Sequence, residues 1–393
     1  MEVQLEHAIQ ILLIGASFGI CIFILALLWH RENAASSRYL AVFFAANIVN
    51  QLDEWFWHLN LWQIAPWFTH AYMPFLYLLA PSFYLYVKHL TIQNQGSTLR
   101  TDAKHGFGFV ASLILCIPYY ALDHTTKLAR LAAPSGSLEH LGFVTWGPTI
   151  ALILLLPFSL GYLVAIVKLL THHLNTIKSY FSNIDNRDLS WIRWSIIALM
   201  VTLVVSGVRI FLPPHLSEMG WQNIVFLSVE LTWLLVVGIL SIHQRPIYEN
   251  AIESERAAQC TSDNDTKYQN SPMSPEDVTR LQAKLTLAMQ ENLYSDPNLT
   301  LRKLSDKTGI AEIKISQVLN TEMNMGFYDF INSWRIQAAC KQMEFADKTI
   351  LDIAFDVGFN SRSTFNQAFK KHTQTTPSAF RKQLVAAQKP STG

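Results

Sequence analysis

Charged residues are scarce in this sequence: Asp, Glu, Lys and Arg make up 15% of its 393 residues, against 50% for the hydrophobic types. Soluble globular domains usually carry about 25% charged residues, so the shortage argues against a wholly soluble protein. It is also uneven, because charge is thin up to about residue 245 and ordinary beyond it. The formal net charge of +1 therefore says less about binding partners than the distribution of charge along the chain.

Cysteine is also rare, with four in the chain: Cys21, Cys116, Cys260 and Cys340. None belongs to a CxxC pair, and no Cys/His cluster has the spacing of a zinc site. We therefore expect no disulfide framework, no metal site and no cofactor. The N-terminus lacks the basic region of a cleaved signal peptide, so we expect the apolar run that follows it to remain as a membrane span.

Long apolar runs dominate the first part of the chain. A helix needs about 20 residues to cross roughly 30 Å of hydrocarbon. We therefore predict a transmembrane bundle of seven helices, at Ile9–Trp29, Tyr39–Leu61, Trp67–Leu90, His105–Leu122, Pro148–Leu170, Trp194–Leu212 and Trp221–Ile242.

The basic residues of the loops predict the orientation of this bundle, because Lys and Arg stay on the cytoplasmic side. The even-numbered loops hold only Lys127 and Arg130. The odd-numbered loops hold Arg31, Arg38, Lys88, Arg100, Lys104, Lys178, Arg187 and Arg193. We therefore expect the N-terminus outside and the C-terminal part of the chain in the cytoplasm.

Several polar residues fall inside the predicted spans, where each is costly unless it has a partner or a function. They are Asn47, Gln51, Glu54 and His58 on one helical face of the second span, Arg209 in the sixth span and Glu230 in the seventh. They either line a cavity that binds a small polar ligand or a proton, or form a hydrogen-bond network that holds the helices together. Glu54 and His58 alone are too few ligands to argue for a metal.

Motifs of enzymes and of light receptors are missing. The sequence has no P-loop and no glycine-rich nucleotide-binding loop, so a sensor kinase or another enzyme is not expected. The seventh predicted span contains no lysine, which excludes a retinal Schiff base there.

An internal repeat marks the C-terminal part of the chain. Leu301–Asn320 (LRKLSDKTGIAEIKISQVLN) aligns with Ile350–Lys370 (ILDIAFDVGFNSRSTFNQAFK), which has one extra residue. Each copy has a short apolar-periodic helix, a glycine in the turn and a second helix, which is the helix-turn-helix pattern. Phe327–Met343 is predicted as one long helix that bridges the copies, and Ser274 and Pro275 mark the start of the domain's first helix.

The second copy and its continuation, ILDIAFDVGFNSRSTFNQAFKKHTQTTPSAFRK from Ile350 to Lys382, resemble the AraC/XylS family of transcription regulators. The resemblance covers Pro275–Gln388, although Thr375 stands where the family usually has glycine and Ala311 where a Ser or Thr cap is usual. It implies an all-helical domain with two recognition helices, about Ala311–Asn320 and Arg362–Lys371, that read successive major grooves of double-stranded DNA. It also implies a bacterial source and RNA polymerase as a partner.

Helical periodicity predicts which side chains of these recognition helices face outward. Gln and Asn pair with adenine and Arg with guanine, whereas Lys, Arg and Ser also contact phosphates. The predicted DNA-binding residues are Ile313, Lys314, Ser316 and Gln317 in the first unit, and Ser361, Arg362, Ser363, Asn366, Gln367, Lys370, Lys371 and Arg381 in the second.

Together these features predict a sensory transmembrane domain at residues 1–245, a cytoplasmic linker at 246–274 and a DNA-binding domain at 275–389. The predicted function is a one-component transcription regulator in the inner membrane of a bacterium, surrounded by lipid and controlled by a small-molecule or physical signal. Dimerisation through the bundle would couple the state of the membrane to DNA occupancy. The alternative is a receptor or transporter-like protein whose C-terminal domain acts through a protein partner.

Overall fold

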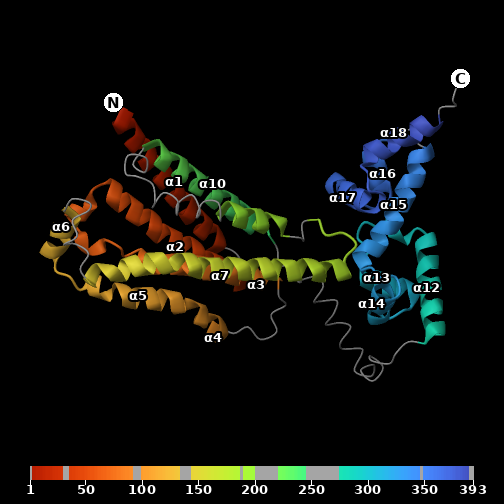
Figure 1. The fold of residues 1–393 in the computed structure, drawn as a ribbon, viewed down its shortest axis with the longest axis horizontal. Helices are drawn as coiled ribbons and strands as arrows, with labels where there is room; N and C mark the ends of the chain where they lie inside the picture. The colour runs from red at the N-terminus through yellow and green to blue at the C-terminus, as the bar shows by residue number, and fades with distance from the viewer. Residues whose placement is uncertain are drawn as a thin grey trace. The chain divides into compact units, whose positions relative to one another are not determined.

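The computed structural model describes residues 2–29, 35–91, 99–132, 143–185, 189–199, 220–244, 274–345 and 348–388. Helices make up most of these ranges, which contain no strand beyond one isolated bridge between Phe181 and Thr300 (Figure 1). The prediction of an all-α protein is therefore confirmed for the described residues.

The contacts between residues divide the chain into two compact units. The first unit comprises Met1–Leu170 and Leu189–Asn250, and the second comprises Thr171–Asp188 and Ala251–Gly393. The second unit thus takes in a short segment from the middle of the chain as well as the C-terminal part.

The first unit is a bundle in which α1 packs against α2 and α10, and α2 packs against α3. Buried Phe44, Val87 and Leu234 belong to its main core. Its helices are α1 (Glu2–Trp29), α2 (Ala35–His58), α3 (Met73–Thr91), α4 (Leu99–Asp102), α5 (Phe107–Tyr120), α6 (His124–Ala132), the larger part of α7 (Phe143–Tyr180), a helix at residues 190–199 and α10 (Gly220–His243).

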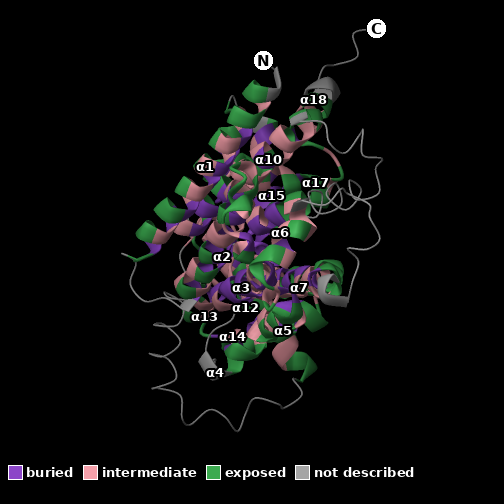
Figure 2. Ribbon diagram, turned by 90° about the vertical axis from the view of Figure 1, so that its left-hand side faces the viewer, coloured by how far each residue is buried: buried purple, intermediate pink, exposed green. Residues whose placement is uncertain are grey.

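Three helices of the described part are long and apolar enough to cross a membrane, at Gln4–Trp29, Trp146–Tyr180 and Trp221–Ile242. Only 17 to 28% of the residues in their most apolar windows are buried inside the protein. Large apolar side chains are exposed instead, among them Leu12 at 72% and Ile153 at 66% (Figure 2). Such helices would be unfavourable in water, because exposed apolar surface of this extent needs a cover.

The prediction of seven spans is reproduced only in part. Helices α2 and α3 overlap the expected second and third spans, with α3 beginning at Met73, but they are not among the candidate spans. Their polar side chains make both helices less apolar than the three candidates. The expected fourth span, His105–Leu122, contains α5 and ends before α6, and a bend of 96° separates these two helices. They count as one further span only if taken together. Most of the sixth, Trp194–Leu212, lies outside the described residues.

The second unit contains two small helical cores joined by one helix. Phe327, Phe330 and Ile331, from the first half of α15, lie in one core, and Ile336 and Met343, from its second half, lie in the other. The prediction of a bridging helix is confirmed. The helices are α12 (Pro275–Gln290), α13 (Leu301–Thr308), α14 (Glu312–Thr321), α15 (Phe327–Phe345), α16 (Ile350–Asp356), α17 (Arg362–Thr373) and α18 (Pro377–Gln388), with a 3-10 turn at Leu293–Ser295.

Local sequence signals explain where these helices begin and turn. Ser274 caps α12 by accepting a hydrogen bond from the backbone N–H of Asp277, with Pro275 in the first turn, as predicted. Gly309 (φ 67°) and Gly358 (φ 98°) both adopt the left-handed conformation in the turns of the two units. Glycine is favoured there because it has no Cβ to clash with the backbone.

Candidate nucleic-acid interface

Two helix pairs in the second unit have the helix-turn-helix arrangement, α13 with α14 and α16 with α17. In each pair the glycine follows the first helix and a short connection leads into the second. The second helices, Glu312–Thr321 and Arg362–Thr373, lie close to the predicted recognition helices. In this motif the second helix enters the major groove and its outward side chains contact the base edges.

Helix α14 has a sharp division between buried and exposed positions. Ile315, Val318 and Leu319 are buried against the first core. The predicted contact residues of this unit lie on the other side: Ile313, Lys314 and Gln317 are exposed and Ser316 is half-buried. Ala311 provides no side-chain cap, so the first turn of this helix lacks the stabilisation that its counterpart has.

Helix α17 has the same division and a stronger start. Phe365, Ala368 and Phe369 are buried, and the Oγ of Ser361 caps the helix by accepting a hydrogen bond from the backbone N–H of Thr364 at 3.2 Å. The predicted contact residues sit on its free face: Arg362, Ser363, Gln367, Lys370 and Lys371 are exposed, whereas Ser361 and Asn366 are half-buried.

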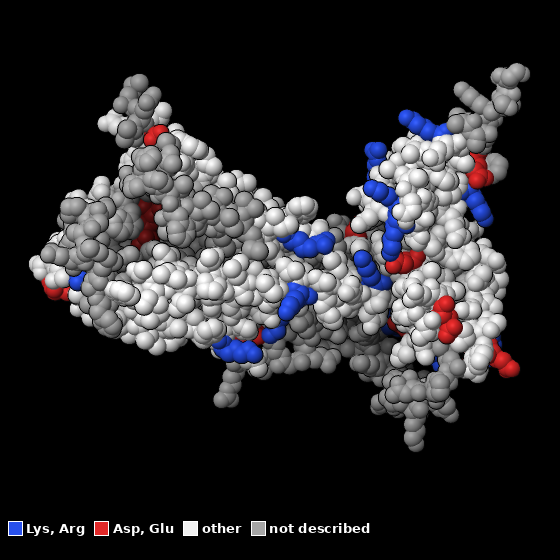
Figure 3. All heavy atoms as spheres, viewed as in Figure 1, with Lys and Arg blue, Asp and Glu red and all other residues white. Residues whose placement is uncertain are grey.

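Basic side chains gather around this second recognition helix, and Figure 3 shows Lys and Arg (blue) over the part of the second unit where α17 lies. Lys371 also forms an ion pair with Asp329 at 2.6 Å. Arg381 differs from the other predicted contacts, because its Nε and Nη2 atoms are buried and have no hydrogen-bond partner among the described residues. A positive surface of this kind attracts the phosphates of a nucleic acid.

Arg335 lies at the junction of the two helix-turn-helix units and is fully buried. Five hydrogen bonds engage its guanidinium, which has five N–H donors. The acceptors are the carbonyl oxygens of Tyr294 (2.8 Å), Asp296 (2.8 Å) and Ser182 (3.1 Å), the Ser182 Oγ (3.1 Å) and the Asn332 Oδ1 (3.4 Å). Its Cζ also lies 5.5 Å from the centre of the Phe359 ring. It therefore joins the segment that precedes α13, in the first helix-turn-helix unit, to the turn between α16 and α17, in the second helix-turn-helix unit.

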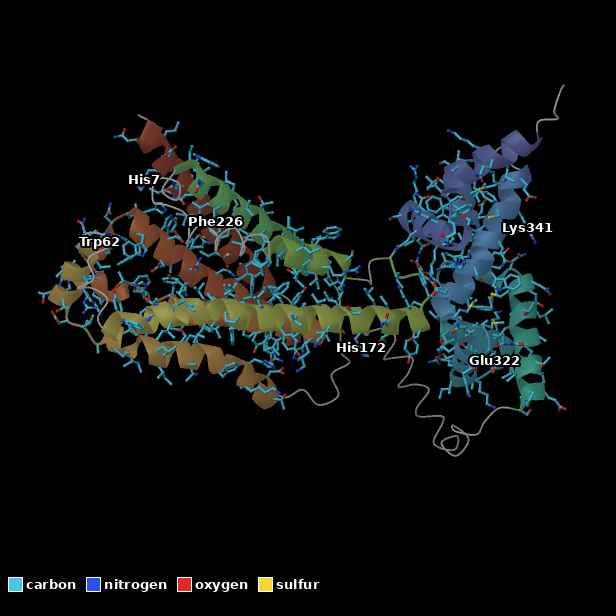
Figure 4. The ribbon with its side chains drawn as sticks, in the orientation of Figure 1. His7, Trp62, His172, Phe226, Glu322 and Lys341 are labelled. Atoms are coloured by element: carbon cyan, nitrogen blue, oxygen red, sulfur yellow. The ribbon has the colours of Figure 1, made fainter. Side chains whose placement is uncertain are left out.

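The role of Arg335 was not predicted from the sequence. The available signal was its position midway between buried Ile331 and Ala339, each four residues away on the same face of α15. Lys341 on the same helix is exposed on its outer side (Figure 4). Burial lowers the pKa of Arg335 to about 10, while Tyr328 and Asp296 act to raise it. Arg335 is therefore still charged at neutral pH.

The structure brings together only some of the polar residues predicted inside the spans. Gln51 Nε2 donates to Glu230 Oε1 at 2.8 Å and thereby links α2 to α10. Asn47 bonds within its own helix to the carbonyl oxygen of Phe43, and the ring of His58 lies 5.4 Å from that of His7. Glu54 is half-buried, and Arg209 lies outside the described residues.

Sequence analysis missed Asp53, which is buried on a different face of α2. Its Oδ1 has no hydrogen-bond partner in the described part of the chain. It does not belong to the repeating polar face of α2, because it lies out of step with Gln51 and Glu54. The described residues contain no group of three or more His, Cys, Asp or Glu side chains placed to hold a metal ion.

Comparisons with known proteins concern the C-terminal part of the chain. Residues 304–383 match the family model of a helix-turn-helix domain. Over 89 residues the chain is 35% identical to an uncharacterized HTH-type transcriptional regulator of Staphylococcus aureus strain COL. The aligned segment covers 23% of this chain but only 12% of that protein. It is 28% identical over 93 residues to PqrA, a probable transcription factor of Proteus vulgaris, covering 24% of this chain and 76% of PqrA.

Two solved structures were also found. One is a protein of unknown function from Listeria innocua, with 26% identity, coverage of 29% of this chain and 98% of that one, and a TM-score of 0.24. The other is the C-terminal domain of AraT, a response regulator from Geobacillus stearothermophilus, with 23% identity, coverage of 29% and 88%, and the same TM-score of 0.24. The family model and the curated relatives show that the chain carries a helix-turn-helix domain similar to those of transcription regulators. None of the matches described extends over more than 29% of the chain.

Proposed function

We propose that this chain is a membrane-bound transcription regulator that binds specific DNA sequences through two helix-turn-helix units and responds to a signal received by its first unit. The observation that carries the proposal is the pair of recognition helices, α14 and α17, each with a buried apolar face and a free polar face. The buried Arg335 connects the two helix-turn-helix units. Such a pair suits two successive major grooves on one side of a duplex.

The side chains on the free faces suit direct base recognition. Gln317, Asn366 and Gln367 carry amides that pair with adenine, and Arg362 carries a guanidinium that pairs with guanine. Lys370 and Lys371, exposed at the end of α17, suit phosphate contacts that hold the helix in register.

The proposal places the first unit in the inner membrane of a bacterium, with seven spans, the N-terminus outside and the DNA-binding unit in the cytoplasm. Three long apolar helices with mostly exposed side chains support this placement. The distribution of Lys and Arg between the loops supports the orientation. Lipid would cover the exposed apolar surface, and the polar contact between Gln51 and Glu230 would help hold α2 against α10.

Genome-wide capture of DNA by the tagged full-length chain tests this function. Cells are crosslinked, their membranes are isolated and washed, and the DNA that remains with the protein is sequenced. We expect discrete sites that share a motif in the membrane fraction. In the double variant Arg362→Ala/Gln367→Ala we expect these sites to be lost, because each well-placed base contact contributes about 1–3 kcal/mol of discrimination.

The matched control is Arg280→Ala, an exposed arginine on α12 that pairs with Asp277. It removes the same charge from the same unit and should leave the sites in place. Uniform recovery of DNA that does not respond to the double variant would refute the proposed mode of binding. Recovery of the chain and its DNA only outside the membrane fraction would refute the proposed location.

A further inference from the structure

A short segment that follows helix α7 belongs to the DNA-binding unit. Helix α7 runs without a break from Phe143 to Tyr180, and its residues from Thr171 onward are part of the second unit. The helix contains a candidate span that begins at Trp146, and about 20 residues suffice to cross a membrane. The last turns of α7 and the residues after it are therefore available to contact the helix-turn-helix units.

Ser182 is the anchor of this segment. It is buried, and both its backbone N–H (3.1 Å) and its Oγ (2.7 Å) donate to the carbonyl oxygen of Leu299, just before α13. Its own carbonyl oxygen and Oγ accept hydrogen bonds from Arg335. Phe181 and Thr300 form the adjoining antiparallel bridge. The segment thus docks at the junction that connects the two helix-turn-helix units.

Two charged side chains extend this docking on either side of Ser182. Lys178 Nζ lies over the Tyr328 ring, 5.8 Å from its centre, near the start of α15. Asp185 reaches the second recognition helix, where its Oδ2 lies 3.4 Å from the Oγ1 of Thr364. The Thr364 hydroxyl also lies 2.7 Å from the Ser361 Oγ and 3.1 Å from the Ser361 carbonyl oxygen, so Asp185 is one of three oxygen partners around it.

The position of Asp185 is unfavourable for DNA binding. Thr364 is in the first turn of α17, where the helix dipole attracts a negative charge. When a recognition helix enters the major groove, its N-terminal end is the part closest to the bases and the phosphates. A carboxylate at that end occupies a place that suits a phosphate and repels the DNA backbone.

We propose that residues 178–185 form an autoinhibitory latch, in which Ser182 anchors the segment on Arg335 and Asp185 competes with a DNA phosphate for the N-terminus of α17. This inference rests on the proposed function and specifies how it is regulated. Because the latch continues directly from α7, a displacement of that helix withdraws Asp185 and frees the recognition helix. The signal then passes through α7 and does not depend on the linker at residues 246–274.

The test compares DNA affinities of full-length variants in detergent micelles. The probes are a duplex of about 30 base pairs carrying the motif most enriched in the genomic capture, and a shuffled duplex of the same composition. Asp185→Asn should bind both duplexes about tenfold more tightly than the parent, a change of about 1.4 kcal/mol. Its affinity should also fall more steeply with salt, by about one unit of the log–log slope, because one more phosphate contact forms.

Two control variants separate this effect from a general change of charge. Glu276→Gln removes one negative charge from the exposed first turn of α12 and should raise affinity much less. Asp185→Glu keeps the carboxylate and should behave like the parent. An Asp185→Asn chain that binds no more tightly than Glu276→Gln, or more weakly than the parent, overturns the latch while leaving the proposed function intact. Absence of specific binding in every variant overturns the proposed function and the latch together.

Discussion

Replacement of Arg335 by alanine is expected to destabilise the DNA-binding unit by at least about 3 kcal/mol, a large share of the roughly 5–15 kcal/mol that holds a typical domain folded. The variant removes the Arg335 donor from the carbonyl oxygens of Tyr294 and Ser182, whereas the carbonyl oxygen of Asp296 keeps the N–H of Leu299 at 3.2 Å. Each unsatisfied buried group costs about 1–3 kcal/mol. The cavity left by the side chain adds to the loss.

Hydrogen exchange of the full-length chain measures this effect, followed on the amides of α13 to α17. The Arg335→Ala chain should lose protection across both helix-turn-helix units, since the arginine contacts both of them. Arg280→Ala is the matched control, because Arg280 is 69% exposed and its ion pair with Asp277 is on the surface. Exposed pairs of this kind contribute about 0–1 kcal/mol. Equal protection in the two variants would show that the junction does not depend on Arg335.

The second large loss of stability is expected at the turn between α16 and α17, in the second helix-turn-helix unit. A Cβ added at Gly358 would lie 2.7 Å from the carbonyl oxygen of Ser295 and 2.9 Å from that of Tyr294, both backbone atoms. At Gly309 a Cβ would meet no atom within 4 Å. Both glycines have positive φ, so an alanine at either position costs about 1–2 kcal/mol in backbone strain. Overpacking adds about 1–3 kcal/mol at Gly358 alone.

Urea unfolding of the two alanine variants is monitored by proteolysis of the whole DNA-binding unit. The free energy of unfolding of Gly358→Ala should be well below that of Gly309→Ala. Gly358→Ala should also lose specific DNA binding, because the clash pushes the second helix-turn-helix unit away from the segment that precedes α13. Gly309→Ala should keep it at a temperature where the unit stays folded. Similar losses of stability in the two variants would mean that the close approach of Gly358 to Ser295 does not constrain the protein.

The helices of the DNA-binding unit were predictable because their signals are local. The glycine turns, the cap at Ser274 and the apolar spacing of α14 and α17 all act within a few residues of one another. The buried and exposed faces of the recognition helices follow directly from that spacing. Which of the exposed residues contact DNA stays a prediction.

The junction was not predictable, because it depends on contacts between distant residues. Arg335 bonds to Ser182 across 153 positions, and Ser182 bonds to Leu299 across 117. Hydrophobic periodicity carries no information about such pairs. Sequence analysis also treated the residues after α7 as a membrane loop, since their basic charge suited that role. Their place in the second unit became evident only from the contacts.

The membrane part shows a different limit. Composition identified α1, α7 and α10 correctly as helices able to cross a membrane. The other predicted spans are not among these candidates, because polar residues lower the hydropathy of α2 and a bend of 96° separates α5 from α6. The pairing of Gln51 with Glu230 joins two of the predicted polar positions, whereas Asn47 and His58 have other partners.

Hydroxyl-radical footprinting of the full-length protein on its captured DNA site tests most directly whether both helix-turn-helix units bind one duplex. We predict two protected segments on the same face of the DNA, with centres about 10–10.5 base pairs apart. In the Arg362→Ala/Gln367→Ala variant, the DNA segment contacted by the second helix-turn-helix unit should lose its protection first. A single protected segment that both this variant and a Lys314→Ala/Gln317→Ala variant leave unchanged would contradict DNA recognition by the paired units.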